Sequence, residues 1–169
     1  MRLFYFSNVV TISLCFVLWL VFQAGAAILC LNLPDSAFRP DAFFFRSHSW
    51  EKNGQLYETL FAVKRWKHLL PDGGAVWKKK GYQKKRLTDF SEQNLNRFLV
   101  ESARGEFSHW LAILPFWVFG LFAPPEVIWI MLVYALAINM PCIIAQRYNR
   151  PRILALMAHR KSSRHAPCI

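Results

Sequence analysis

The sequence predicts an all-α integral membrane protein that forms a single membrane domain over residues 1–169, with about three transmembrane helices. Three stretches without any charged residue support this fold class: residues 3–33, 110–123 and 127–145. The first is longer than the roughly 20 apolar residues that a helix needs to cross the hydrocarbon core of a bilayer. Hydrophobic residues make up 54% of the chain and charged residues 18%, which is typical of a small membrane protein with a substantial polar part.

Residues 3–33 are interpreted as the first span. A secretory signal peptide is the alternative, because Ala24-Gly25-Ala26 resembles a cleavage site. However, the region before the apolar run contains only Arg2 as a cation, and the run is longer than the hydrophobic part of a typical signal peptide. These two features favour a retained helix.

Residues 34–96 are expected to form a cytoplasmic, partly interfacial region of helices and loops between the first and second spans. Residues 37–50 combine three consecutive phenylalanines with arginines, which suits the membrane interface, where rings meet acyl chains and cations meet headgroups. Pro71 and the glycines after it predict a turn at residues 70–74. The lysine-rich residues 78–86 are expected to face anionic membrane lipids.

Residues 97–123 are predicted to be a polar helix that runs into the second span. At about 100° per residue, one stripe of this helix carries Asn94, Arg97, Glu101, Arg104 and Ser108. His109 lies to one side of the stripe, directly before the charge-free stretch. Charged groups at the edge of a membrane are costly unless they are paired, and they indicate a functional site. The alternative is a helix end whose charges pair with each other or with headgroups.

Residues 127–146 are predicted to be the third span, and residues 147–169 a basic cytoplasmic tail. Pro141 removes a backbone donor from the span, and Asn139 is placed to help satisfy the backbone near it. Most of the lysines and arginines lie between residues 39 and 104 or in the tail. The positive-inside rule therefore places both regions in the cytoplasm, with the N-terminus outside and the C-terminus inside.

This topology predicts one pocket at the cytoplasmic membrane surface. The short turn at residues 124–126 makes the second and third spans antiparallel neighbours. The polar start of the second span and the polar end of the third then lie on the same side of the membrane. The residues expected to line the pocket are Glu101, Arg104, His109, Arg147, Asn149 and Arg150.

The formal net charge of +11 is compatible with nucleic acid, anionic lipid or an acidic carrier protein as a partner. The membrane spans favour anionic membrane lipids and argue against nucleic acid. The four cysteines form no C-x-x-C pair, disulfide framework or zinc site. Glu106 and His109 have the spacing of half a carboxylate-bridged metal site, but the partner motif is missing, so no metal is expected.

Three motifs lie in the polar parts of the chain: Trp66-Lys67-x-x-Leu70-Pro71-Asp72-Gly73, Glu101-Ser102-x-Arg104-x-Glu106-x-x-His109-Trp110 and Gln146-Arg147-Tyr148-Asn149-Arg150-Pro151-Arg152. With them the chain resembles the glycosyl-4,4'-diaponeurosporenoate acyltransferase family over nearly its whole length. That family is associated with the last step of staphyloxanthin synthesis, the acylation of a sugar hydroxyl on a carotenoid glycoside. The resemblance implies a multi-pass cell-membrane acyltransferase that holds no bound cofactor and takes its acyl group from acyl-CoA or an acyl-carrier protein.

Acyl transfer to a hydroxyl needs a base at the attacking oxygen and hydrogen-bond donors for the carbonyl oxyanion. His109 is the predicted base, and Glu106 or Glu101 is predicted to orient its ring and stabilise the imidazolium. Arginine suits bidentate contacts to phosphate. The side chains expected to hold the oxyanion or a donor phosphate are Arg104, Arg147 or Asn149.

The residues assigned to substrate binding are Arg97, Asn139, Gln146, Arg147, Asn149, Arg150, Trp66, Lys67 and Asp72. The basic residues 78–86 are expected to attract the phosphates of coenzyme A or the acidic surface of a carrier protein. The alternative function is a non-catalytic membrane protein that binds anionic lipid or scaffolds a partner enzyme.

Overall fold

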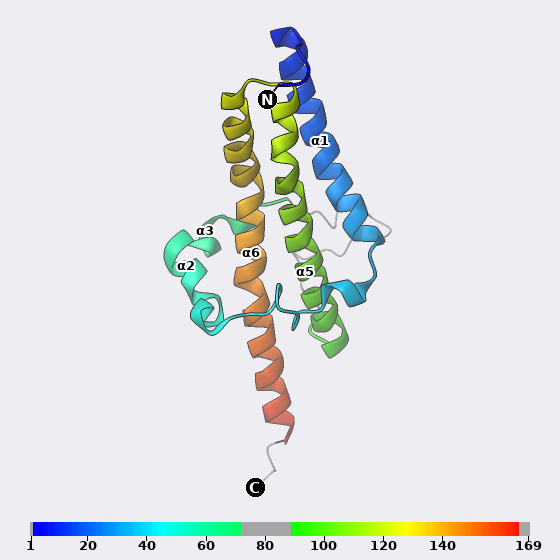
Figure 1. The fold of residues 1–169 in the computed structure, drawn as a ribbon. Coiled ribbons are helices and arrows are strands. Elements are labelled where there is room, and N and C mark those ends of the chain that lie inside the picture. The colour runs from blue at the N-terminus through cyan, green and yellow to red at the C-terminus, as the bar shows by residue number, and fades with distance from the viewer. Residues whose placement is uncertain (1, 72–88, 166–169) are drawn as a thin grey trace. The chain divides into compact units, whose positions relative to one another are not determined.

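The structure is a computed structural model, and it describes residues 2–71 and 89–165. All regular secondary structure in this part of the chain is helical, which confirms the predicted all-α class. The α-helices are α1 (Asn8–Asn32), α2 (Gln55–Phe61), α3 (Val63–Trp66), α5 (Glu92–Ile113) and α6 (Pro125–His165) (Figure 1). The short 3-10 helices are η1 (Asp35–Phe38), η2 (Ser49–Gly54), η3 (Lys67–Leu69) and η4 (Leu114–Leu121).

Among the described residues, two helices are long and apolar enough to cross a membrane: α1 and α6. This is the part of the membrane prediction that the structure supports. The number of three spans and the orientation with the N-terminus outside stay predictions. The chain forms two compact units, one from Met1–Leu33 and Gly105–Ile143, the other from Pro34–Arg104 and Ile144–Ile169.

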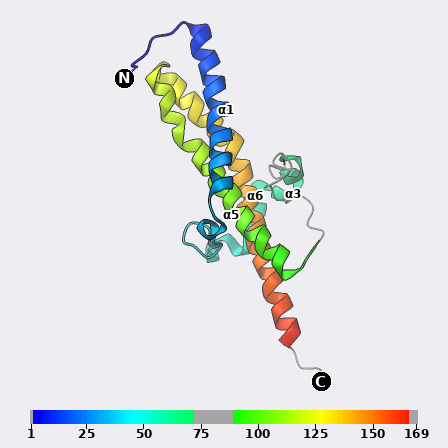
Figure 2. The same cartoon turned by 90° about the vertical axis from the view of Figure 1, so that its right-hand side faces the viewer.

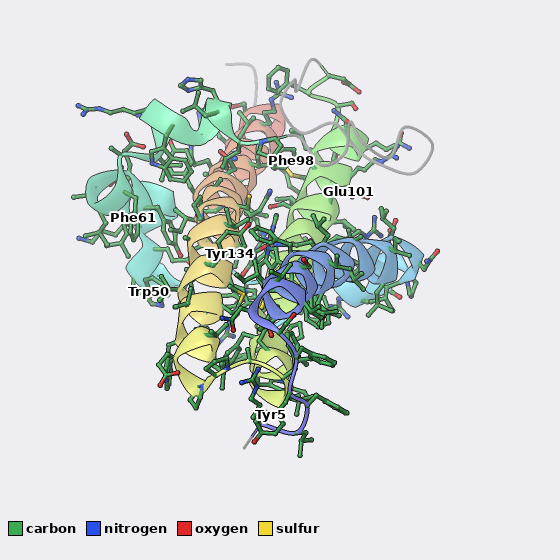
Figure 3. All side chains as sticks on the ribbon, turned by 90° about the horizontal axis from the view of Figure 1, so that it is seen from above. Tyr5, Trp50, Phe61, Phe98, Glu101 and Tyr134 are labelled. Carbon is green, nitrogen blue, oxygen red and sulfur yellow. The ribbon has the colours of Figure 1, made fainter. Side chains whose placement is uncertain are left out.

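In the first unit, α1, the end of α5 and the start of α6 run side by side (Figures 1 and 2). Their core is aromatic: the ring of Trp19 on α1 packs against Phe119 of η4 and edge-on against Tyr134 of α6, with centroids 6.3 and 5.3 Å apart. Tyr134 is labelled in Figure 3. Phe16 and Leu20 of α1 remain more than half exposed. This outward apolar face suits a helix surrounded by lipid.

The predicted second span is not one α-helix. α5 ends at Ile113, and the 3-10 helix η4 continues the chain with Pro115 near its start. Proline has no backbone N–H and its ring clashes with the preceding turn, so it ends an α-helix readily. The end of η4 is tied to the N-terminus, because the backbone N–H groups of Leu3 and Phe4 donate to the Leu121 carbonyl at 2.7 and 3.0 Å.

The helix that contains the third predicted span, α6, continues well beyond residue 146. α6 passes through Pro141 and Pro151, and the part of the basic tail that the structure describes is helical as far as His165. Pro141 frees the carbonyl four residues earlier, that of Ala137, but the Asn139 side chain donates to the Ala135 carbonyl instead, at 2.9 Å. Asn139 therefore bonds to a different carbonyl from the one that Pro141 frees, contrary to the expectation.

In the second unit, the segment from η1 to η3 packs with the start of α5 and the end of α6. Its core contains Phe38, Phe45, Phe98 and Tyr148, all nearly fully buried. Gly54 begins α2 with φ at +85°, and a Cβ there would lie 2.6 Å from the Tyr148 carbonyl oxygen. Glycine is thus required both by the left-handed backbone and by the close approach of α6.

Candidate functional site

The two compact units divide the predicted site residues. His109, Glu106 and Asn139 belong to the first unit, and the remaining described candidates belong to the second. Asp72 and the basic residues 78–86 lie outside the described residues. Each group is therefore described separately, and the convergence of all candidates on one pocket stays a prediction.

In the first unit, three helices bring polar side chains together inside an apolar bundle. Nδ1 of His109 on α5 lies 2.8 Å from Oδ1 of Asn139 on α6. Nε2 of Gln23 on α1 donates to the same oxygen at 3.2 Å. Asn139 is fully buried. Polar groups at this depth are costly unless they are hydrogen-bonded, and such groups mark functional sites in membrane proteins.

The hydrogen bonds of Asn139 decide the tautomer of His109. Nδ2 of Asn139 donates to the Ala135 carbonyl, so the side-chain amide presents its oxygen to His109 and Gln23. An amide oxygen only accepts hydrogen bonds, and Nδ1 of His109 must therefore carry the proton. In the neutral ring, Nε2 is then the nitrogen with a lone pair.

The sequence predicted Asn139 as a substrate-binding residue and did not identify Gln23. The sequence does contain a signal that could have identified Gln23, because this residue is an amide in the middle of an apolar, charge-free helix. Glu106, one of the two predicted orienting carboxylates, is fully buried on α5. It lies in the same unit as His109.

Glu101, the other predicted orienting carboxylate, is engaged in an ion-pair cluster of the second unit. The guanidinium of Arg104 forms ion pairs with Glu101 and with Asp35, and it stacks over the Phe38 ring at 5.0 Å. The side chains of Glu101 and Arg104 are only 10% exposed. Figure 3 shows Glu101 one turn after Phe98 on α5. This cluster joins α5 to η1.

A second buried carboxylate, Glu51, was not predicted from the sequence. It is fully buried, and it accepts from the Tyr57 hydroxyl at 2.9 Å and from the His48 backbone N–H at 3.2 Å. Arg147 pairs with it at 3.4 Å and also donates to the carbonyls of Phe44 and Arg46. The sequence signal was Glu51 at the third position of a helix start, where a carboxylate caps backbone donors.

Arg150 is also fully buried, and it makes its hydrogen bonds within the second unit. It donates to the Phe45 carbonyl at 2.7 Å and lies 3.4 Å from the Ser102 hydroxyl. Trp66, assigned to substrate binding, donates from Nε1 to the Phe61 carbonyl at 2.7 Å. Arg97 is exposed on α5, and the Gln146 side chain carries a buried oxygen without a hydrogen-bond partner.

Lys67 and Asn149, both assigned to substrate binding, contact each other although they lie far apart in the chain. Nζ of Lys67 donates to Oδ1 of Asn149 at 3.0 Å and lies 4.9 Å from the ring centroid of Tyr148. Burial lowers the pKa of the Lys67 ammonium, and the positive charges of Arg152 and Lys64 lower it further, against the opposing effect of Glu58. These are the properties of a cation in a crowded, partly desolvated position.

An apolar groove runs along the first unit between α1 and the junction of α5 with η4. Its volume is about 440 Å³, and Gly25 of α1 and Leu114 and Trp117 of η4 are among the residues that line it. A side chain at Gly25 would meet no atom within 4 Å, so this part of the groove is open. The groove can hold a hydrocarbon chain.

Comparison with known proteins gives consistent matches. A family model described as glycosyl-4,4'-diaponeurosporenoate acyltransferase matches residues 41–159. A protein of that name from Staphylococcus aureus strain Newman is 35% identical over 157 residues, which cover 92% of this chain and 94% of the relative. Proteins of the same name from strains bovine RF122 / ET3-1 and USA300 are 34% identical with the same coverage. No solved structure matches the chain.

Proposed function

The chain belongs to the glycosyl-4,4'-diaponeurosporenoate acyltransferase family, and on this premise we propose that it transfers a fatty acyl group from an activated donor to a hydroxyl of a lipid-like acceptor at the cell membrane. The name of the relatives points to the sugar of a carotenoid glycoside as the acceptor. The donor is acyl-CoA or an acyl-carrier protein, and both present the acyl group as a thioester. Two long apolar helices, α1 and α6, support the membrane location.

His109 is proposed as the general base. Nε2 of His109 takes the proton of the acceptor hydroxyl while the oxygen attacks the thioester carbonyl carbon. The tetrahedral intermediate collapses as the carbon–sulfur bond breaks, and the leaving thiolate takes the proton back from the imidazolium. The products are an ester and a free thiol, and His109 returns to its neutral form.

Asn139 is proposed to position the base. The observation that carries the mechanism is the contact of 2.8 Å between its Oδ1 atom and Nδ1 of His109. A hydrogen-bond acceptor at Nδ1 holds the ring orientation and keeps the lone pair on Nε2, as the third member of a nucleophile–histidine–asparagine constellation does in other enzymes. Gln23 holds the same oxygen from α1.

The apolar groove between α1 and η4 is proposed to hold the hydrocarbon chain of a substrate. Its volume of about 440 Å³ falls within the range of about 300–1,000 Å³ that is usual for ligand pockets. Each methylene group that leaves water for such a surface contributes about 0.8 kcal/mol. The groove therefore favours a hydrocarbon chain over water.

The second candidate function is a non-catalytic membrane protein that binds anionic lipid or scaffolds a partner enzyme. One observation favours it: Arg104 and Arg147 lie in closed ion pairs with Asp35, Glu101 and Glu51. Such pairs stabilise a fold without any catalytic role. The His109 variant below separates the two candidates, since a scaffold does not need a base.

The test is the His109→Gln variant, assayed as purified protein with an acyl-CoA donor and a glycoside acceptor. Glutamine keeps much of the size and some hydrogen bonding but cannot accept the proton, so kcat should fall about 10²–10⁴-fold. His159→Gln, an exposed position on α6, is the matched control and should keep full activity. Turnover near that of wild type in His109→Gln would contradict the mechanism, provided that thermal unfolding shows both variants to be folded.

A further inference from the structure

Two cations in the second unit share one aromatic ring. Nζ of Lys67 and Cζ of Arg152 each lie 4.9 Å from the centroid of the Tyr148 ring. The ring itself is almost fully buried, whereas Arg152 is exposed. Lys67 comes from η3 and the other two from α6, so the tertiary fold places these charges together.

The partners that hold the two cations in place are neutral. Arg152 donates from Nη1 to the Tyr148 hydroxyl, and Lys67 donates from Nζ to Oδ1 of Asn149. Within residues 2–71 and 89–165, neither cation has a carboxylate within ion-pair distance. In the same unit, Arg104 and Arg147 do pair with carboxylates.

Two like charges that are held close without a carboxylate repel each other, and partial burial strengthens the repulsion. The carboxylate of Glu58 is the acidic group that influences Lys67, and one of its oxygens accepts from the backbone N–H of Lys64 at 3.0 Å. Burial is the main cause that lowers the pKa of Lys67, and the charge of Arg152 lowers it further. An anion that binds both cations would offset the repulsion.

We propose that Lys67 and Arg152 form a binding site for a phosphate group, with Asn149 beside it as a further hydrogen-bond donor. A guanidinium offers a planar fork of donors to phosphate oxygens, and an ammonium offers a mobile point charge. Asn149 uses its oxygen for Lys67, and its side-chain amide has two further N–H donors to offer to an anion.

The phosphate has two possible sources with the same chemistry: the donor's coenzyme or phosphopantetheine moiety, or an anionic lipid headgroup. The donor source rests on the proposed acyl transfer, but the phosphate site itself does not. Binding measured without turnover therefore tests the site independently of the chemistry at His109.

The experiment uses the full chain in a neutral detergent and measures the affinity of two soluble probes by calorimetry. Coenzyme A represents the donor, and dihexanoylphosphatidylglycerol represents the headgroup. Lys67→Gln and Arg152→Gln should each weaken binding of the relevant probe about tenfold or more, because each removes a charge-assisted hydrogen bond. Arg65→Gln removes the same charge from an exposed position near Lys67 and is the matched control; it should leave the affinity unchanged.

Loss of coenzyme A binding alone identifies the donor as the source of the phosphate, and loss of lipid binding alone identifies the headgroup. Equal affinities for wild type, Lys67→Gln and Arg152→Gln, or no binding of either probe to wild type, would overturn the proposal. His109→Gln should bind both probes as wild type does, so a failed mechanism leaves this result intact. Thermal unfolding of each variant checks that the fold is kept.

Discussion

Nδ1 of His109 and Oδ1 of Asn139 lie 2.8 Å apart, although 30 positions separate the two residues in the sequence. The contact joins α5 to α6 inside the first unit. The sequence suggested a carboxylate, Glu106 or Glu101, as the partner of this ring. The orienting role of either carboxylate stays a prediction. The amide at Nδ1 needs no counter-charge to be buried.

Asn139→Leu should lower kcat roughly fivefold to tenfold, because a typical hydrogen bond contributes about 1 kcal/mol net. Asn139→Asp keeps an acceptor for Nδ1 and should retain more activity than Asn139→Leu. In the double variant with His109→Gln, the Asn139 substitution should cost nothing further, since the base that it positions is gone. Steady-state kinetics of the variants, each checked by thermal unfolding, measure these effects.

Glu106→Gln tests whether the Glu106 carboxylate, rather than the Asn139 amide, orients the His109 ring. If Glu106→Gln lowers kcat more than Asn139→Leu and couples more strongly to His109→Gln, the carboxylate rather than the amide orients the ring. Additive effects of Asn139 and His109 substitutions would also contradict the positioning role of Asn139.

Phosphate binding at Lys67 should weaken with rising pH earlier than an ordinary lysine would allow. Burial, then Arg152 and Lys64, lower the pKa of Lys67 against the opposing Glu58, and only the charged ammonium attracts the anion. The charge is therefore lost as pH rises through a pKa below the usual value of about 10.4. Desulfo-coenzyme A is the suitable probe, because it lacks the thiol that titrates in this pH range. Its phosphate monoester is already a dianion well above pH 6.

Lys67→Arg is the control for this pH dependence. Arginine stays charged over the whole range, so the variant should bind the probe with an affinity that falls less steeply between about pH 8 and 10. The phenol of Tyr148 faces the same site and is present in both proteins, so it cancels in the comparison. Identical pH profiles for wild type and Lys67→Arg would contradict the role of the Lys67 charge.

Gly54→Ala should destabilise the protein markedly. The new Cβ would lie 2.6 Å from the Tyr148 carbonyl oxygen, and the backbone at +85° is strained for any residue with a side chain. Gly25→Ala, in open space on α1, is the control and should leave the thermal midpoint in detergent unchanged or slightly raised, since alanine favours helix. Equal midpoints for the two variants would contradict this packing.

Topology is tested with single cysteines in a background without the native ones. A cysteine at Glu126, in the predicted outer turn, should react with an impermeant reagent on intact cells, and one at Lys161 should react only after permeabilisation. Both positions are exposed. Labelling of both from the same side would rule out the predicted arrangement of N-terminus outside and C-terminus inside.

The sequence was sufficient for the features that depend on composition and local pattern. Charge-free apolar runs predicted α1 and the first half of α6 as helices long enough to cross a membrane. Such a prediction is possible because hydropathy and length are properties of a single segment. The polar stripe of α5 and the motifs that contain Lys67 and Asn149 stay predictions of where the site lies. Local reasoning failed at Pro115, where α5 gives way to a 3-10 helix, and beyond residue 146, where α6 continues through Pro151.

The sequence alone determined the helical class, the apolar segments, the family and His109 as the base to examine. Only the tertiary structure decided the partners: Asn139 for His109, Gln23 for Asn139, Asp35 and Glu101 for Arg104, Glu51 for Arg147, and the shared ring of Tyr148 for Lys67 and Arg152. The physical reason is that a buried polar group must find a partner wherever the packing brings one within hydrogen-bond distance. Helix packing brings together residues from segments far apart in the chain. The periodicity of one segment does not predict which residues of another segment it will contact.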